Sequence, residues 1–160
     1  FNWTEQEIGY SLAFVGILVS LVQGGLIRWF IPKYGQSKAI FYGILFYAFG
    51  LFCFAFATSS WMMYAFLIPY CLGGLCGPAI QGVISNQIPE NEQGEIQGLN
   101  TSLMSISAII SPLLMTNLFY QFSKNDATLY FPGISFFISG ILAIIAAIII
   151  YFSLKKIKLD

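Results

Sequence analysis

The spacing of the charged residues constrains this chain more than any other feature. Only seven Lys or Arg and seven Asp or Glu occur in 160 residues, and they leave four long uncharged stretches, over residues 8–27, 39–89, 96–123 and 127–154. A helix needs about 20 apolar residues to cross the hydrocarbon core of a bilayer. A soluble domain usually has about a quarter of its residues charged, whereas this chain has 9%. The sequence therefore predicts an all-α, polytopic transmembrane helical bundle.

The second uncharged stretch is long enough for two membrane helices, because the polar segment 58–61 interrupts it. We therefore expect five spans, over residues 8–30, 39–57, 62–88, 97–119 and 131–153. Basic residues concentrate in cytoplasmic loops. All of them except Lys124 fall on one side of this arrangement: Arg28, Lys33, Lys38, Lys155, Lys156 and Lys158. The prediction is a multi-pass protein of the cell (inner) membrane, with its first residue outside and its C-terminus cytoplasmic.

Several function classes require residues that this sequence lacks. It has no His, the commonest general base and metal ligand, and its three Cys residues lie in apolar segments and form no C-x-x-C pair. The spans offer Ser, Thr and Cys without a buried base, which argues against a membrane-embedded hydrolase. The net charge is zero and there is no basic run, so nucleic acid is not an expected partner. We expect no enzyme activity, catalytic residue, metal site or cofactor.

Three spans, 8–30, 62–88 and 97–119, combine an aliphatic face with a small or polar one. Small residues let helices approach closely, and amide and hydroxyl groups need partners that lipid does not offer. We expect these faces to turn inward, and spans 39–57 and 131–153, rich in Phe, Ile, Leu and Ala, to be peripheral. The residues predicted to face a substrate cavity are Gln23, Ser20, Gln81, Asn100 and Ser105. The alternative for any single Ser or Thr is that it only joins helices.

Span 62–88 also carries residues that bend or loosen a helix. Gly73, Gly74, Gly77 and Pro78 lie near its middle, and a proline is tolerated in a membrane helix when neighbouring groups satisfy the freed carbonyls. We expect these four residues to permit helix movement. The alternative is a static kink with close packing.

The loop between the third and fourth spans carries the most specific motif. It reads Pro89-x4-Gly94-x2-Gln97-Gly98, and Ser111-Pro112-Leu113-Leu114 follows in the next span. Together these segments closely resemble the loop and penultimate helix of major facilitator drug efflux transporters of the tetracycline-resistance type. Further matching segments occur along the chain: Trp3, Ile8-Gly9-x-Ser11-Leu12, Gly16-Ile17-Leu18, Ser20-Leu21, Gln23, Phe56-Ala57-Thr58, Trp61-Met62, Gly73-Gly74, Pro78-Ala79 and Gln81.

The resemblance implies that residues 1–160 are the C-terminal half of a major facilitator (6+6 helix) fold, with the five spans as helices eight to twelve. It implies proton-coupled efflux of drugs or metabolites, with a small-molecule substrate, protons, the N-terminal half of the same transporter and the lipid bilayer as partners. No Asp, Glu, Lys or Arg lies within a span except Arg28 at the end of the first. A titrating carboxylate is therefore expected outside these 160 residues, and the non-Met start is expected of a fragment.

Two departures from the resembled family bear on the substrate. Tetracycline pumps of this type carry a His in the helix that matches span 8–30 and an Asp in the helix that matches span 39–57. This sequence has Val19 and Tyr47 at those positions, which argues against tetracycline itself as the substrate. The alternative function is that of a truncated, non-transporting remnant or a membrane assembly partner.

Overall fold

The computed structural model describes residues 3–124 and 129–156, and all of its regular structure is helical. Five helical stretches are long and apolar enough to cross a membrane: Glu5–Tyr34, Gln36–Ala55, Ser60–Gln87, Gln93–Ser123 and Ile134–Lys155. The predicted all-α class and the predicted number of spans are confirmed, and each stretch begins within a few residues of its predicted start.

Two of the five stretches are interrupted by an irregular turn. The first consists of α1 (Glu5–Leu21), a π-helical turn η1 (Val22–Leu26) and α2 (Ile27–Tyr34). The third consists of α4 (Ser60–Leu72), a 3₁₀ turn η2 (Gly73–Leu75) and α5 (Cys76–Gln87). The other three are single helices: α3 (Gln36–Ala55), α6 (Gln93–Ser123) and α7 (Ile134–Lys156).

Local sequence signals explain where the first helices begin and end. The Thr4 hydroxyl accepts a 3.3 Å hydrogen bond from the Glu7 backbone N–H, and the Glu7 carboxylate accepts one of 2.7 Å from the Thr4 backbone N–H. This reciprocal capping satisfies two N–H groups that the first helical turn leaves unpaired. Gly35, at φ 86° and ψ 160°, adopts a conformation that is essentially restricted to glycine. The chain therefore ends α2 and reverses into α3 at this residue.

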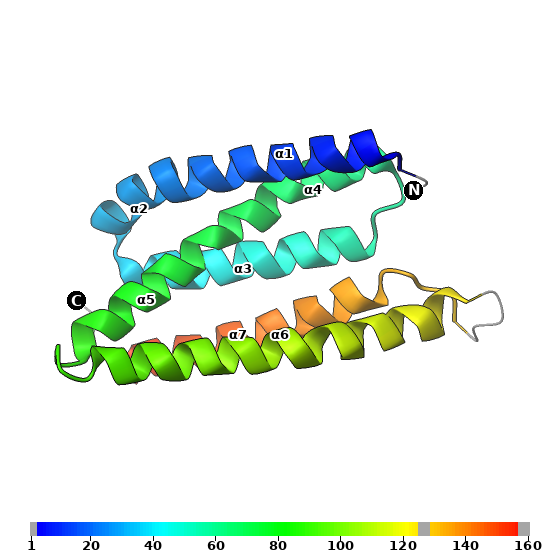
Figure 1. Ribbon diagram of the computed structural model, residues 1–160. Helices are drawn as coiled ribbons and strands as arrows, with labels where there is room; N and C mark the ends of the chain where they lie inside the picture. The colour runs from blue at the N-terminus through cyan, green and yellow to red at the C-terminus, as the bar shows by residue number, and fades with distance from the viewer. Residues whose placement is uncertain (1–2, 125–128, 157–160) are drawn as a thin grey trace.

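Helix α3 is the centre of this bundle, in contact with α2, α4, η2, α5 and α7 (Figure 1). Small residues make that position possible. A Cβ atom added at Gly43 would lie 2.8 Å from the Cys76 backbone nitrogen, and one added at Gly50 would lie 2.7 Å from the Tyr70 Cα atom. Ala39 and Ala48 are fully buried. The expectation that span 39–57 is peripheral is wrong for these five helices, because its Ala and Gly residues admit close neighbours despite the abundance of Phe and Ile.

Helix α7 packs along α3 through a similar small-residue stripe. Gly140 lies under the Phe52 ring, where an added Cβ atom would be only 3.0 Å from the ring carbons, and Ala143 is buried with Ala48 and Leu51 in one core cluster. The expectation that span 131–153 is peripheral also needs correction here, since α3 and α7 form the most extensive helix pair in the described chain.

Helices α1 and α6 are the exposed members of the bundle. Helix α6 contacts chiefly α7, where the Ser135 hydroxyl donates a 2.9 Å hydrogen bond to the Met115 carbonyl. Neither α1 nor α6 contains a buried residue. Figure 1 shows them at opposite edges of the bundle. The core therefore lies around α3, and the polar faces predicted to turn inward are open within these five helices.

Candidate functional site

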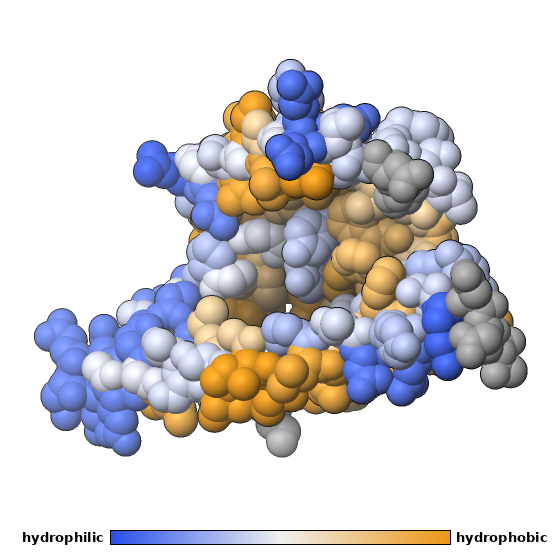
Figure 2. Space-filling model, turned by 45° about the vertical axis from the view of Figure 1, so that its right-hand side comes forward, coloured by the Kyte–Doolittle hydropathy of each residue, from blue (hydrophilic) through white to orange (hydrophobic). Residues whose placement is uncertain are grey.

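The face between α1 and α6 is hollowed, and its two rims mix hydrophobic and hydrophilic side chains (Figure 2). All five residues predicted to face a cavity lie on the first, third and fourth helical stretches, which border this region. Ser20 is on α1, Gln23 on η1 and Gln81 on α5, whereas Asn100 and Ser105 are on α6.

Hydrogen bonding divides these five residues into two groups. The Ser20 hydroxyl donates to the Gly16 carbonyl at 2.7 Å, and the Ser105 hydroxyl donates to the Thr101 carbonyl at 2.9 Å. Their protons are thus occupied by their own helices, which leaves only oxygen lone pairs for another partner. The amides of Gln23, Gln81 and Asn100 form no hydrogen bond within the described residues. These amides have the greatest capacity to bind a polar ligand or a facing helix.

Gln23 lies on the π-helical turn η1, where one extra residue is inserted into the helix. Such turns are rare and occur frequently at functional sites. Within this turn Val22 is buried, whereas Gln23 and Gly24, which follow it, are exposed. The Val22 side chain lies over Gly74 of η2, 3.7 Å from the position of an added Cβ. The irregular turns of the first and third stretches therefore pack against each other.

The four residues predicted to permit helix movement lie at and beside this crossing point. Gly73 and Gly74 form the 3₁₀ turn η2 with Leu75, and a Cβ at Gly73 would lie 2.6 Å from the Tyr47 Cβ atom. Gly77 and Pro78 begin α5 and are exposed, with open space around the Gly77 position. The helix is irregular where the glycines occur. Because a static kink and a moving hinge would have the same geometry in one structure, the movement stays a prediction.

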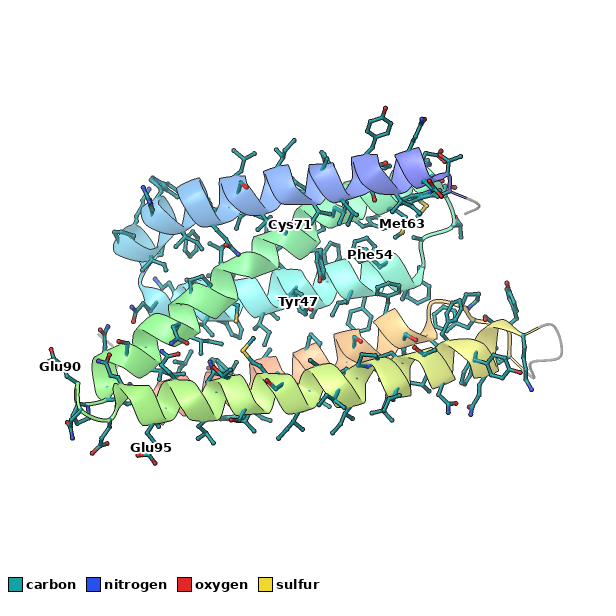
Figure 3. The ribbon with its side chains drawn as sticks, in the orientation of Figure 1. Tyr47, Phe54, Met63, Cys71, Glu90 and Glu95 are labelled. Carbon is teal, nitrogen blue, oxygen red and sulfur yellow. The ribbon has the colours of Figure 1, made fainter. Side chains whose placement is uncertain are left out.

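The predicted residues do not form one cluster. The contact between η1 and η2 brings Gln23 close to the third stretch, which also carries Gln81. Asn100 and Ser105 lie across the hollow on α6, whose principal neighbour is α7. Helices α5 and α6 approach each other near their connecting turn, where the Gln93 side chain donates a 3.4 Å hydrogen bond to the Ser85 carbonyl. Glu90 and Glu95 lie at this end of the bundle and point outward (Figure 3).

The structure adds an aromatic cluster that the sequence analysis missed. Phe54 of α3 is at its centre, with ring centroids 5.5 Å from Tyr70, 5.7 Å from Phe136 and 6.5 Å from Phe66. Tyr47 extends the cluster, 5.0 Å from Tyr70. Tyr47 and Phe54 are two helical turns apart on α3 (Figure 3), a spacing that puts them on one face. That spacing was a usable signal, but aromatic residues are so abundant here that it did not stand out.

A small apolar pocket of about 130 Å³ adjoins this cluster. Four helices contribute to it, and it is lined by Trp3, Ser11, Val15, Phe54, Met63, Leu67 and Phe136. Trp3 closes one side, since its indole N–H donates a 2.8 Å hydrogen bond to the Ser60 hydroxyl and its ring stacks 5.9 Å from that of Tyr64. Aromatic and thioether side chains favour an apolar or aromatic ligand by shape and polarizability.

Comparison with known proteins bears directly on this arrangement. Residues 1–159 match the family model of the Major Facilitator Superfamily. The chain is 42% identical over 120 residues to the class E tetracycline resistance protein of Escherichia coli, covering 74% of this chain and 29% of that protein. It is 31% identical over 156 residues to the class H protein of Pasteurella multocida, covering 98% of this chain and 38% of that protein.

A more distant similarity extends beyond bacteria. The chain is 27% identical over 129 residues to Hippocampus abundant transcript-like protein 1 of Bos taurus, covering 76% of this chain and 26% of that protein. The chain thus spans about a third of the length of the curated tetracycline resistance proteins it matches. No solved structure matched it. The resemblance drawn from the loop motif is confirmed: with five apolar helices and a family match along its length, this membrane protein belongs to the Major Facilitator Superfamily.

Proposed function

We propose that this chain supplies the C-terminal half of a secondary transporter that exports a small molecule by proton-coupled antiport. The observation that carries the proposal is the family match over residues 1–159, together with relatives named for tetracycline resistance. In secondary transporters built from two repeats, the substrate site lies near the membrane midplane between halves that rock against each other. The exposed polar faces of α1 and α6 are where the N-terminal half packs.

The irregular turns inside two of the membrane-length helical stretches support this proposal. Discontinuous helices free backbone and amide groups at the depth where a substrate binds. Gln23 on η1 and Gln81 on α5 provide the amides, and Asn100 on α6 provides a third from across the hollow. Ser20 and Ser105 offer acceptor oxygens only. Gly73, Gly74, Gly77 and Pro78 let the third stretch bend as the two halves exchange access.

The proton is carried outside these helices in this proposal. The spans contain no Asp or Glu away from their ends, and an ionisable group within the membrane is the usual proton carrier. Tyr47, at the position where the resembled tetracycline pumps have an Asp, packs its side chain over Gly73 and beside Tyr70. Its packing role supports a substrate other than tetracycline. The pocket of about 130 Å³ beside Phe54 and Met63 has room only for a small apolar or aromatic group of a substrate.

The orientation follows from the basic residues. Those in the loop between the first two spans and at the end of α7 mark the cytoplasmic side of the cell (inner) membrane. The turn between α5 and α6 lies on the same side, and residues before α1 lie outside. Cysteine labelling of the full-length natural chain in intact cells, at Ser37 and at Thr58, tests this: only the Thr58→Cys variant reacts with an impermeant maleimide.

Transport itself is tested with the full-length natural chain in proteoliposomes that carry a pH gradient. A panel of aromatic drugs and metabolites is screened for gradient-dependent flux, and the Gln23→Leu and Gln81→Leu variants are compared with Gln121→Leu. Gln121 is exposed near the other end of α6 and bonds only to Asn117. We expect at least tenfold lower flux for the first two variants and no change for the third.

Two results would go against this proposal. Equal flux in all three variants would remove Gln23 and Gln81 from the substrate path. A well-folded, full-length protein that carries no gradient-dependent flux of any compound would favour the alternative of a non-transporting remnant or assembly partner.

A further inference from the structure

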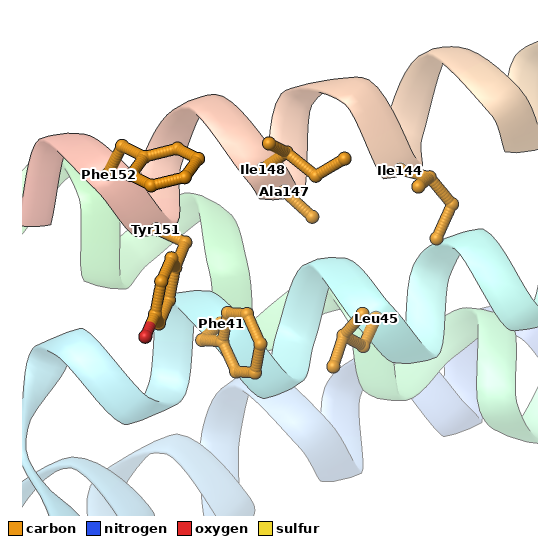
Figure 4. A pocket seen from close by; sticks show the side chains of 7 residues that line it. All are labelled: Phe41, Leu45, Ile144, Ala147, Ile148, Tyr151 and Phe152. Atoms are coloured by element: carbon orange, nitrogen blue, oxygen red, sulfur yellow. The ribbon is translucent and has the colours of Figure 1, made fainter.

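A second surface feature lies away from the hollow, on the outer side of the α3–α7 pair. There the two helices form a groove of about 360 Å³ (Figure 4). Its lining side chains are apolar except for one hydroxyl, and they are Phe41, Leu45, Ile144, Ala147, Ile148, Tyr151 and Phe152. Phe41 and Tyr151 face each other across it, with ring centroids 5.7 Å apart.

The groove continues toward the ends of both helices into a second hollow of about 400 Å³, since Phe41 and Tyr151 line both. The second hollow is polar where the first is not. Ser37, Lys38 and Tyr42 of α3 line it, together with Leu154 and Lys155 of α7. The two hollows therefore form one continuous surface channel. Apolar side chains line one end of it, and two lysines line the other.

The two lysines of the second hollow are available to a ligand. Both are exposed, and neither pairs with a carboxylate in the part of the chain that the structure describes. Glu90 in the α5–α6 turn and Glu95 in the first turn of α6 lie on other segments and point away from the bundle (Figure 3). Two unpaired ammonium groups beside hydroxyl donors favour an anion, and a phosphate group in particular.

The surroundings indicate that this channel faces lipid. The side chains flanking it are large and apolar, such as Ile148 at 52% and Phe152 at 61% exposure. Helices α1 and α6 also expose large apolar side chains, such as Leu12 and Leu113, but they carry Ser, Thr and amide groups beside them. Basic pockets between membrane helices on the cytoplasmic side bind the head groups of anionic lipids.

We propose that this channel is a binding site for an anionic phospholipid. Its phosphate group binds Lys38 and Lys155, Tyr42 and Ser37 donate hydrogen bonds to it, and an acyl chain lies in the apolar groove between Phe41 and Ile148. The lipid bridges α3 and α7 at one end of their interface. The site is separate from the hollow between α1 and α6, so lipid binding is independent of which substrate is exported.

Native mass spectrometry of the full-length natural chain, purified in a mild detergent, tests the site. The protein is titrated with phosphatidylglycerol and, separately, with phosphatidylcholine. We expect phosphatidylglycerol to bind at lower concentration. Because each lysine near an anionic lipid contributes about a fivefold gain, the Lys38→Gln/Lys155→Gln double variant should bind phosphatidylglycerol about thirtyfold more weakly, with phosphatidylcholine binding unchanged. Lys33→Gln removes one charge outside the channel, where Lys33 lies over the Trp29 ring, and is the control for loss of positive charge at this end of the bundle.

A matched pair of variants tests the apolar part of the channel. Ile148→Ser places a polar group in the groove and should weaken the binding of both lipids, whereas Ile149→Ser, at a neighbouring exposed position outside the groove, should not. Inorganic phosphate at millimolar concentration should not displace phosphatidylglycerol, because it lacks the acyl chain. Equal affinity for the two lipids, a double variant indistinguishable from Lys33→Gln, or displacement by phosphate would each overturn the proposal.

Discussion

The close approach of α3 and α4 gives a quantitative prediction at Gly50. A Cβ atom at this position would lie 2.7 Å from both the Cα and the backbone nitrogen of Tyr70. Carbon atoms are at their optimal separation at about 3.5–4.0 Å, so Gly50→Ala must push α3 and α4 about 1 Å apart. The obstacle is helix backbone, which cannot rotate away as a side chain can. Overpacking of this kind costs about 1–3 kcal/mol, and a gap of about 1 Å forfeits up to half of the dispersion energy along the contact.

Alanine is also a better helix former than glycine, and this gain in stability must be subtracted from the cost of overpacking. It stabilises a helix by about 1 kcal/mol relative to glycine. Gly94→Ala isolates that advantage, because Gly94 lies in the first turn of α6 with no atom within 4 Å of an added Cβ. We expect Gly50→Ala to lower the free energy of unfolding by up to about 2 kcal/mol and Gly94→Ala to raise it by up to about 1 kcal/mol. Equilibrium unfolding of the full-length chain in mixed detergent micelles measures both. A Gly50→Ala protein as stable as Gly94→Ala would refute the close-packing argument.

Two further predictions concern the connections at the ends of the helices. Ser60→Ala removes the acceptor of the 2.8 Å hydrogen bond from the Trp3 indole and should lower the free energy of unfolding by about 1 kcal/mol; a Ser59→Ala control with equal loss in the same micelle assay would contradict this. Gly35→Ala forces a Cβ atom onto a residue with φ 86° and ψ 160° and should cost about 1–3 kcal/mol, measured as a lower midpoint of thermal unfolding. An unchanged midpoint would show that the α2–α3 turn relaxes without strain.

The number and limits of the spans were predictable because they depend on composition along the chain. Bilayer thickness requires long apolar segments, and charges and the polar turn at 58–61 separate them. The central position of α3 was not predictable in the same way. It depends on which face of a Phe-rich helix carries Gly43 and Gly50 and on which helix packs against that face. Mean hydropathy depends mainly on the large apolar side chains and does not reveal where small residues allow close packing.

In the candidate site, too, some features were predictable from sequence and others were not. The amides of Gln23, Gln81 and Asn100 could be selected from sequence, because amides in hydrocarbon need partners. The π-helical turn that carries Gln23 could not, since hydrophobic periodicity describes only regular helices and the packing of Val22 on Gly74 exists only in the folded chain. The aromatic cluster around Phe54 unites residues from three helices. Its existence depends on the crossing of those helices, which no single segment encodes.

The packing of α6 indicates what the described helices need for stability. Lipid tails are as apolar as Leu, so membrane helices associate through van der Waals packing and hydrogen bonds and not through burial from water. Helix α6 has 31 residues, none of them buried. Among the described residues, its side-chain hydrogen bonds to other membrane spans run from Ser135 and Ser139 to Met115 and from Gln93 to the Ser85 carbonyl. The hydroxyls of Thr101, Ser102, Ser105 and Ser107 bond to carbonyls of their own helix. Since so few contacts hold a long helix weakly, we expect the proposed N-terminal half to supply further packing. The face of α6 that carries Asn100 should therefore gain protection from hydrogen exchange only in the full-length transporter.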